Sequence, residues 1–113
     1  MLAKERRISK GLFAQILSRG RVFSGSNLSL RVLPMEKAGP SAFAFVVSVK
    51  MAKTAVERHF LKRRGRHAIK KNLKRIKEGY YCAFFLRPGL AKLPFPVFEA
   101  EIVNGLKQAG LVE

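Results

Sequence analysis

Few residues of this chain could carry acid–base, nucleophilic or metal chemistry. All seven acids are glutamates, and the closest pair, Glu99 and Glu101, would lie on different sides of a helix. The histidines His59 and His67 are eight residues apart, whereas metal-binding pairs on helices are spaced by three or four residues. No glycine-rich loop is followed by the Lys-Ser or Lys-Thr of a nucleotide site. Because metal-dependent protein nucleases use clustered carboxylates, we expect no catalytic residue and no metal site in this chain.

The chemistry that the sequence does support is the binding of a polyanion. From Lys50 to Lys77 the chain has seven lysines and five arginines but a single acid, Glu57. The whole chain has a formal net charge of +16 and a sequence pI of about 11.1. So dense a basic cluster repels itself unless a polyanion neutralises it, and nucleic acid is the obvious one. A merely solvated helix face would interleave Glu with Lys, so we predict nucleic-acid contact; charge alone does not distinguish RNA from DNA.

An amphipathic helix is predicted to carry these charges, with Thr54 as its N-cap and Ala55 as its first residue. The buried stripe is predicted to comprise Leu61, Gly65, Ala68, Ile69, Leu73 and Ile76. The basic face comprises Arg63, Arg66, His67, Lys70, Lys71, Lys74 and Lys77. Gly65 lowers helix propensity, which we interpret as a sign of close packing on a sheet. Val56 and Phe60 lie off the stripe, so the first turn is expected to pack against another element.

The remaining elements predict a small sheet covered by helices. A short helix begins after the N-cap Ser9 and ends at Gly20, and the last helix spans about Val97–Ala109. Between them we predict a connection at Arg21–Ser26, a hairpin-type loop at Met35–Ser41, a proline-rich loop at Pro88–Pro96, and strands at Asn27–Leu33, Ala42–Val49 and Tyr80–Leu86. The order α-β-β-α-β-α indicates a single domain over residues 1–113, an α/β (α+β) two-layer sandwich.

A second candidate surface combines the first helix with the alternating strand. Phe13 and Leu17 lie on one face of the helix, and Asn27, Ser29 and Arg31 lie on one face of the strand. Together they could form a cleft in which bases stack on an aromatic ring and phosphates meet Arg31. The alternative is that Phe13 and Leu17 belong to the core.

Composition also bears on the compartment. The lone Cys82 lies in an apolar run and is expected to be a small buried hydrophobe, so no disulfide can form within the chain. The N-terminal MLAKERRISK has charges without a following apolar run, which argues against a signal peptide, and no stretch is apolar enough for a membrane helix. These features favour a cytoplasmic protein with no membrane partner.

The chain resembles the protein component family of bacterial ribonuclease P over nearly its whole length. KERRISKGLFAQILSRGR is similar to the family's basic arm and first helix, VVSVKMAKTAVERHFLKRRGRHAIK to its central signature, and YYCAFFLRPG to a strand that ends in Arg-Pro. The residues that fit the signature are Ala55, Val56, Arg58, Lys62, Arg63 and Arg66. The chain departs from it where Arg58-His59-Phe60 replaces Arg-Asn-Arg, where Val49 replaces a lysine, and where Ala52 replaces a glycine.

The resemblance implies a fold, two RNA partners and no protein partner. The implied fold has a left-handed β-α-β crossover and is ribosomal protein S5 domain 2-like. The subunit would bind the catalytic RNA and the 5′ leader of precursor tRNA, while the RNA performs Mg²⁺-dependent phosphodiester hydrolysis and the protein itself holds no cofactor. The residues implied to bind the catalytic RNA are Lys50, Lys53, Arg58, His59, Lys62, Arg63, Arg66 and Lys70. Those implied to line the leader cleft are Phe13, Leu17, Asn27, Ser29 and Arg31.

Two other functions remain open from the residues. A small ribosomal or general RNA-binding protein would share the charge but would need no leader cleft. A stand-alone metal nuclease would cleave precursor tRNA without an RNA partner, which the scattered glutamates argue against.

Overall fold

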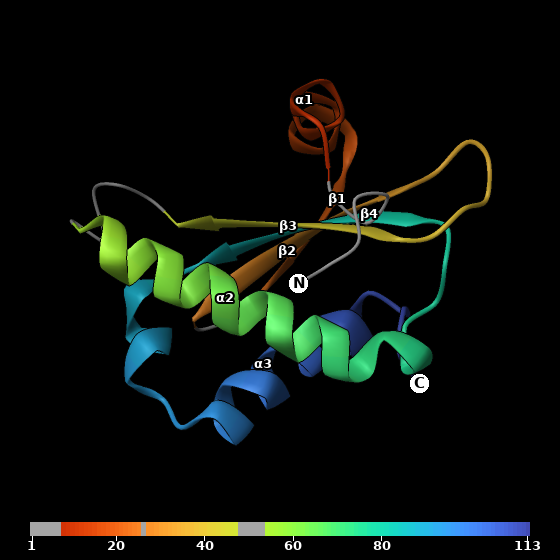
Figure 1. Cartoon of the computed structure of the whole chain (residues 1–113). Coiled ribbons are helices and arrows are strands. Elements are labelled where there is room, and N and C mark those ends of the chain that lie inside the picture. Colours follow the sequence, from red (N-terminus) through yellow and green to blue (C-terminus); the bar gives the residue numbers. More distant parts are fainter. Residues whose placement is uncertain (1–7, 26, 48–53) are drawn as a thin grey trace.

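A four-stranded sheet with helices on both faces forms the body of the protein. The computed structural model describes residues 8–25, 27–47 and 54–113. Its elements are α1 (Lys10–Arg19), β1 (Arg21–Ser24), β2 (Leu28–Pro34), β3 (Ala42–Val47), α2 (Ala55–Asn72), a 3₁₀ segment (Leu73–Arg75), β4 (Tyr80–Leu86), a second 3₁₀ segment (Pro88–Lys92) and α3 (Phe95–Gln108). Helix α1 lies over one face of the sheet, and α2 and α3 lie over the other (Figure 1).

The strand order is β1-β2-β4-β3, which corrects two predictions. Arg21–Ser24, predicted as part of a connection, forms the edge strand β1, because antiparallel pairing with β2 supplies ladder hydrogen bonds that a four-residue pattern does not reveal. The prediction of a hairpin-type loop at Met35–Ser41 was also wrong. The strands that this loop connects, β2 and β3, are not neighbours, because β4 lies between them. Strand β4 is antiparallel to β2 and parallel to β3. The handedness of the β3-α2-β4 crossover stays a prediction.

Both predicted helix N-caps are confirmed. The Ser9 side chain accepts a hydrogen bond of 3.4 Å from the Leu12 N–H, and Thr54 accepts one of 3.1 Å from the Glu57 N–H. Helix α3 begins at Phe95, earlier than predicted, with a proline in its first turn, where the missing N–H leaves no helical bond unmade. Part of the predicted Pro88–Pro96 loop forms the second 3₁₀ segment.

Gly20 ends α1 as predicted, for a steric reason. Its backbone is extended, with φ −71° and ψ 148°, so the left-handed conformation common at helix ends is not what requires glycine. A Cβ at this position would lie 2.5 Å from the carbonyl oxygen of Ile16, which is the acceptor of the Gly20 N–H. Glycine therefore allows β1 to begin directly after the helix.

The apolar stripe of α2 packs on the sheet as predicted. Leu61, Ala68 and Ile69 are fully buried, and a Cβ on Gly65 would lie 2.5 Å from two ring atoms of Phe45 on β3. Close packing at Gly65 is thereby confirmed.

The expectation for the first turn of α2 was wrong. Val56 is 76% exposed and Phe60 is 40% exposed, and neither is among the described residues that form the core or pack against it. On α2, burial in the core therefore begins at Leu61.

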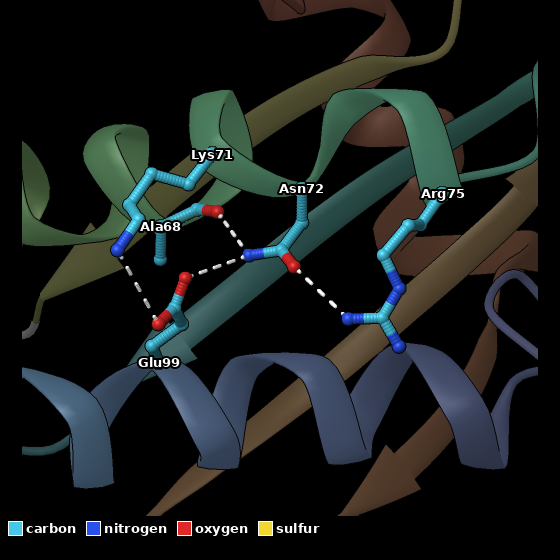
Figure 2. A network of polar contacts seen from close by, with 5 residues as sticks. All are labelled: Ala68, Lys71, Asn72, Arg75 and Glu99. Carbon is cyan, nitrogen blue, oxygen red and sulfur yellow. Dashed lines mark hydrogen bonds and ion pairs between the residues drawn. The ribbon is translucent and has the colours of Figure 1, made fainter.

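Asn72 ends α2 earlier than the apolar pattern predicted and links it to α3 (Figure 2). Its Nδ2 donates to the Ala68 carbonyl oxygen at 2.8 Å and to Glu99 Oε2 at 2.9 Å, while its Oδ1 accepts from Arg75 Nη1 at 3.3 Å. Because this side chain bonds the backbone four residues earlier, the helix tightens into the 3₁₀ segment that follows. Glu99 Oε1 also lies 3.8 Å from Lys71 Nζ. The network thus joins the end of α2 to α3.

Candidate nucleic-acid interface

Part of the basic face of α2 gathers its side chains around one hollow, whereas Lys71, on the same face, lies 3.8 Å from Glu99. Arg63, Arg66, His67 and Lys70 are exposed and together line an open hollow of about 470 Å³. These residues are spaced by three and four along the helix, so their side chains lie on one side of it. The only acid of α2, Glu57, lies in its first turn, where it also complements the helix dipole. The hollow can therefore hold a chain of phosphates.

The structure gathers only some of the residues predicted to bind the catalytic RNA. Arg63, Arg66 and Lys70 line this hollow, whereas Arg58, His59 and Lys62 lie in the preceding turns. Lys50 and Lys53 lie outside the described residues. His67 lines the hollow although it was not among the predicted binding residues, and its place on the predicted basic face was the available signal.

The second surface lies under α1, on the face of the sheet opposite α2 (Figure 1). The Phe13 ring lies 6.1 Å from the ring of Phe85 on β4, centroid to centroid. The Arg31 guanidinium carbon lies 5.6 Å from the Phe85 centroid, and Arg31 Nη1 donates to the Leu17 carbonyl oxygen at 2.8 Å. Ser29 is the register partner of Phe85 and so shares this face. The surface thus combines aromatic rings with a guanidinium.

Phe13 and Leu17 of α1 were predicted to line a cleft or, alternatively, to belong to the core, and each prediction is partly right. Ile16 is fully buried and is the core residue of the helix, whereas Leu17 is 41% exposed and Phe13 is half-buried. Leu17 is therefore not part of the core, and Phe13 offers part of its ring to solvent. Phe85 was missed because β4 is apolar on both faces, and only the strand register shows which of its side chains lie under α1.

Asn27 does not join this surface. Its Nδ2 lies 3.2 Å from each carboxylate oxygen of Glu101, on α3, which covers the other face of the sheet. Asn27 comes just before β2 begins, so the alternation of the strand does not decide its direction. Of the five predicted cleft residues, the structure brings together Phe13, Leu17, Ser29 and Arg31.

Two remaining candidates for chemistry are accounted for. Cys82 is fully buried in the core, and burial raises the pKa of its thiol, so it is the neutral hydrophobe that was expected. Among the described residues, no group of three or more His, Cys, Asp or Glu side chains could hold a metal ion.

Of the helices in the described part of the chain, none has the length and apolar character to cross a membrane.

Comparison with known proteins decides the family. The family model described as Ribonuclease P matches residues 1–110. The chain belongs to this family. The chain is 33% identical to the ribonuclease P protein component of Picosynechococcus sp. over 109 residues, covering 96% of this chain and 93% of that protein. The resemblance predicted from the sequence is thereby confirmed.

Solved structures of ribonuclease P proteins share the fold. The RNase P protein of Staphylococcus aureus has a TM-score of 0.84 at 18% identity, covering 96% of this chain and 98% of that one. The RNase P protein of Thermotoga maritima has a TM-score of 0.80 at 21% identity, covering 90% of this chain and 96% of that one. At these identities the likeness shows the fold alone, and it confirms the predicted mixed α/β class.

Proposed function

We propose that this chain, as a single domain, is the protein subunit of ribonuclease P. It binds the catalytic RNA and the 5′ leader of precursor tRNA, and assists the endonucleolytic removal of the leader in the cytoplasm. The observation that carries this proposal is family membership over residues 1–110. The enzyme is thus an endoribonuclease whose active site lies in its RNA, and the protein contributes binding.

The exposed basic face of α2 is the proposed contact with the catalytic RNA. Arg63, Arg66 and Lys70 would neutralise phosphates from one hollow, and Arg58, His59 and Lys62 would extend the contact toward the helix N-terminus. Lys50 and Lys53 of the preceding segment complete the proposed set. Each phosphate contact releases counterions, so affinity should fall steeply with salt.

The surface under α1 is the proposed site of the leader. Unpaired bases would stack on the exposed parts of Phe13 and Phe85, and a phosphate would meet Arg31. Arg31 uses Nη1 for the Leu17 carbonyl, which leaves its other N–H groups to donate to a phosphate. Leu17 and Ser29 would line the same path. Asn27, held by Glu101, would not contact the leader directly.

Hydrolysis is proposed to depend on Mg²⁺ held by the RNA. Glutamates are few and dispersed in this chain, so hard-cation ligands would come from phosphate oxygens. The protein's part is to offset repulsion between two polyanions, which would lower the Mg²⁺ concentration that cleavage needs.

Cleavage of labelled precursor tRNA at low Mg²⁺ tests this function. Three reactions are compared, containing the protein alone, a bacterial ribonuclease P RNA alone, and both together. We expect cleavage at the mature 5′ end only in the combined reaction. Cleavage by protein alone would identify a stand-alone nuclease, and no stimulation of the RNA would leave a general RNA-binding protein.

A further inference from the structure

An exposed aromatic ring on α2 has no structural role that the fold explains. Phe60 is 40% exposed and is absent from the residues that form the core or pack against it, whereas Phe95 is among them. Phe60, Arg63, Arg64, His67 and Phe95 together line a hollow of about 310 Å³ between α2 and the start of α3. Leaving a phenylalanine in water gains nothing for folding, so the ring calls for another explanation.

Arg64 packs against the rings that border this hollow. Its guanidinium carbon lies 5.2 Å from the Phe60 ring centroid, 5.8 Å from that of Phe95 and 5.0 Å from that of Phe98. Its Nη1 also donates to the Leu90 carbonyl oxygen at 3.0 Å. A cation placed against aromatic faces stabilises their arrangement. Phe60 is therefore positioned before any ligand arrives.

Two further side chains lie against the Phe95 ring. The His67 ring lies 4.9 Å from the Phe95 ring, centroid to centroid, with the planes inclined by 49°. Lys71 Nζ lies 5.4 Å from the centroid of the same phenylalanine. The hollow is therefore lined by the rings of Phe60, His67 and Phe95, which suits a flat aromatic ligand better than an aliphatic one.

The aromatic hollow adjoins the basic one. Arg63 and His67 line both, and the basic hollow adds Arg66 and Lys70. Among the described residues, no acid lines either of them. A flat aromatic group attached to a phosphate is what this pair of hollows matches, and a nucleotide of RNA has that form. A protein segment would instead have to bring acidic groups to four basic side chains while filling only a small apolar space.

We propose that Phe60 stacks on one unpaired base of the catalytic RNA, with the phosphate of the same nucleotide held by Arg63. The base lies in the hollow that His67 and Phe95 also line. This inference rests on the proposed function, since it names a base-binding site within the proposed RNA interface. It assigns to α2 a contact that does not depend on charge.

A tryptophan at position 60 reports directly on stacking, because the chain has no tryptophan of its own. Ribonuclease P RNA and precursor tRNA are titrated separately into the Phe60→Trp protein, and Trp emission is followed. We expect quenching that saturates with the catalytic RNA. The control is Phe23→Trp on β1, a partly exposed residue that pairs with Leu30, on the face of the sheet away from Arg31, and lines neither hollow. The assignment would be overturned if the catalytic RNA quenched the two proteins equally. It would also be overturned if precursor tRNA quenched Phe60→Trp and the catalytic RNA did not.

Affinities separate stacking from charge. Phe60→Ala should weaken binding to the catalytic RNA by about tenfold, since base–aromatic stacking contributes about 1–3 kcal/mol per base. The slope of log affinity against log salt should stay as in wild type, because no phosphate contact is lost. Phe60→Leu, which keeps the apolar volume but has no π face, should bind as weakly as Phe60→Ala, whereas Phe60→Trp should bind like wild type.

The outcomes distinguish the inference from the function. If wild type stimulates the RNA but Phe60→Ala binds as tightly as wild type, the stacking site is wrong and the proposed function stands. If wild type neither binds nor stimulates the RNA, the proposed function itself is wrong, and the stacking site that rests on it is wrong as well. Circular dichroism melting checks folding, and Phe60→Leu should melt at the wild-type temperature because the ring lies outside the core.

Discussion

Arg31 and Leu17 connect the sheet to the helix that lies over it. The Arg31 side chain, on β2, donates from Nη1 to the main-chain carbonyl of Leu17, on α1, at 2.8 Å. The same guanidinium lies 5.6 Å from the Phe85 ring centroid. Arg31 therefore joins α1 to β2 and keeps a positive charge beside the half-buried ring of Phe85.

Replacing Arg31 by alanine should weaken the binding of precursor tRNA that carries a leader. We expect a loss of about tenfold, the effect of one hydrogen bond to a charged group, and no loss with tRNA that lacks a leader. Filter binding with the assembled RNA–protein enzyme measures both substrates. Arg21→Ala is the matched control, since Arg21 is exposed and pairs with Val32 on the other face. Equal losses on both substrates would remove Arg31 from the leader site.

Replacing Phe85 by leucine should reduce leader-dependent affinity while largely preserving the fold. Leucine keeps apolar contact with Phe13 but removes the face on which a base would stack. We expect a loss of about 1 kcal/mol or more in binding, from the same stacking contribution. The comparison of leader-bearing and leaderless tRNA measures it. Unchanged affinity would show that the leader does not touch β4.

Replacing Arg63 by alanine should flatten the salt dependence of binding to the catalytic RNA. One lost phosphate contact should reduce the log–log slope by about 0.7 to 0.9. Lys107→Ala removes the same charge from an exposed position on α3 outside both hollows and should leave the slope unchanged. If Arg63→Ala and Lys107→Ala have the same slope, the net charge of the protein explains the salt dependence and no specific contact at Arg63 is needed.

Gly65→Ala should destabilise the protein although alanine is the better helix former. Helix propensity favours alanine by about 1 kcal/mol, but its Cβ would lie 2.5 Å from the buried ring of Phe45, and overpacking costs about 1–3 kcal/mol. Phe45 itself stacks on Phe84 at 5.3 Å, which limits its retreat. Urea denaturation measures the change. Gly11→Ala is the control and should not destabilise, because no atom of the described residues outside its chain neighbours and its own helix backbone lies within 4 Å of its Cβ.

Asn72→Ala should lower the free energy of unfolding by about 1–3 kcal/mol, because it leaves the half-buried Glu99 carboxylate without its donor. Thermal and urea unfolding report this change. Lys71→Ala removes only the exposed partner of the same carboxylate and should lower stability by less than about 1 kcal/mol. A larger effect for Lys71 than for Asn72 would contradict the hydrogen-bond network of Figure 2.

Features that depend on neighbouring residues could be predicted from the sequence. The caps at Ser9 and Thr54, the strand Tyr80–Leu86 and the stripe from Leu61 to Ile69 follow from local preference and periodicity and were confirmed. Leu73, predicted in the same stripe, lies beyond α2 and is only partly buried. The separation of the basic face from the apolar stripe follows from the same periodicity, because helical geometry alone decides which side chains share a face.

Features that depend on distant residues were decided by the tertiary structure. The position of β4 between β2 and β3 brings Phe85 to Phe13 and Arg31, and no local pattern encodes that order. The pairing of β1 with β2 likewise overrides a weak four-residue pattern. Arg64 meets rings from two helices only because α2 and α3 pack together. The sequence alone thus determined the charge, the helix faces and the family, whereas long-range packing decided which aromatic rings stand beside which cations.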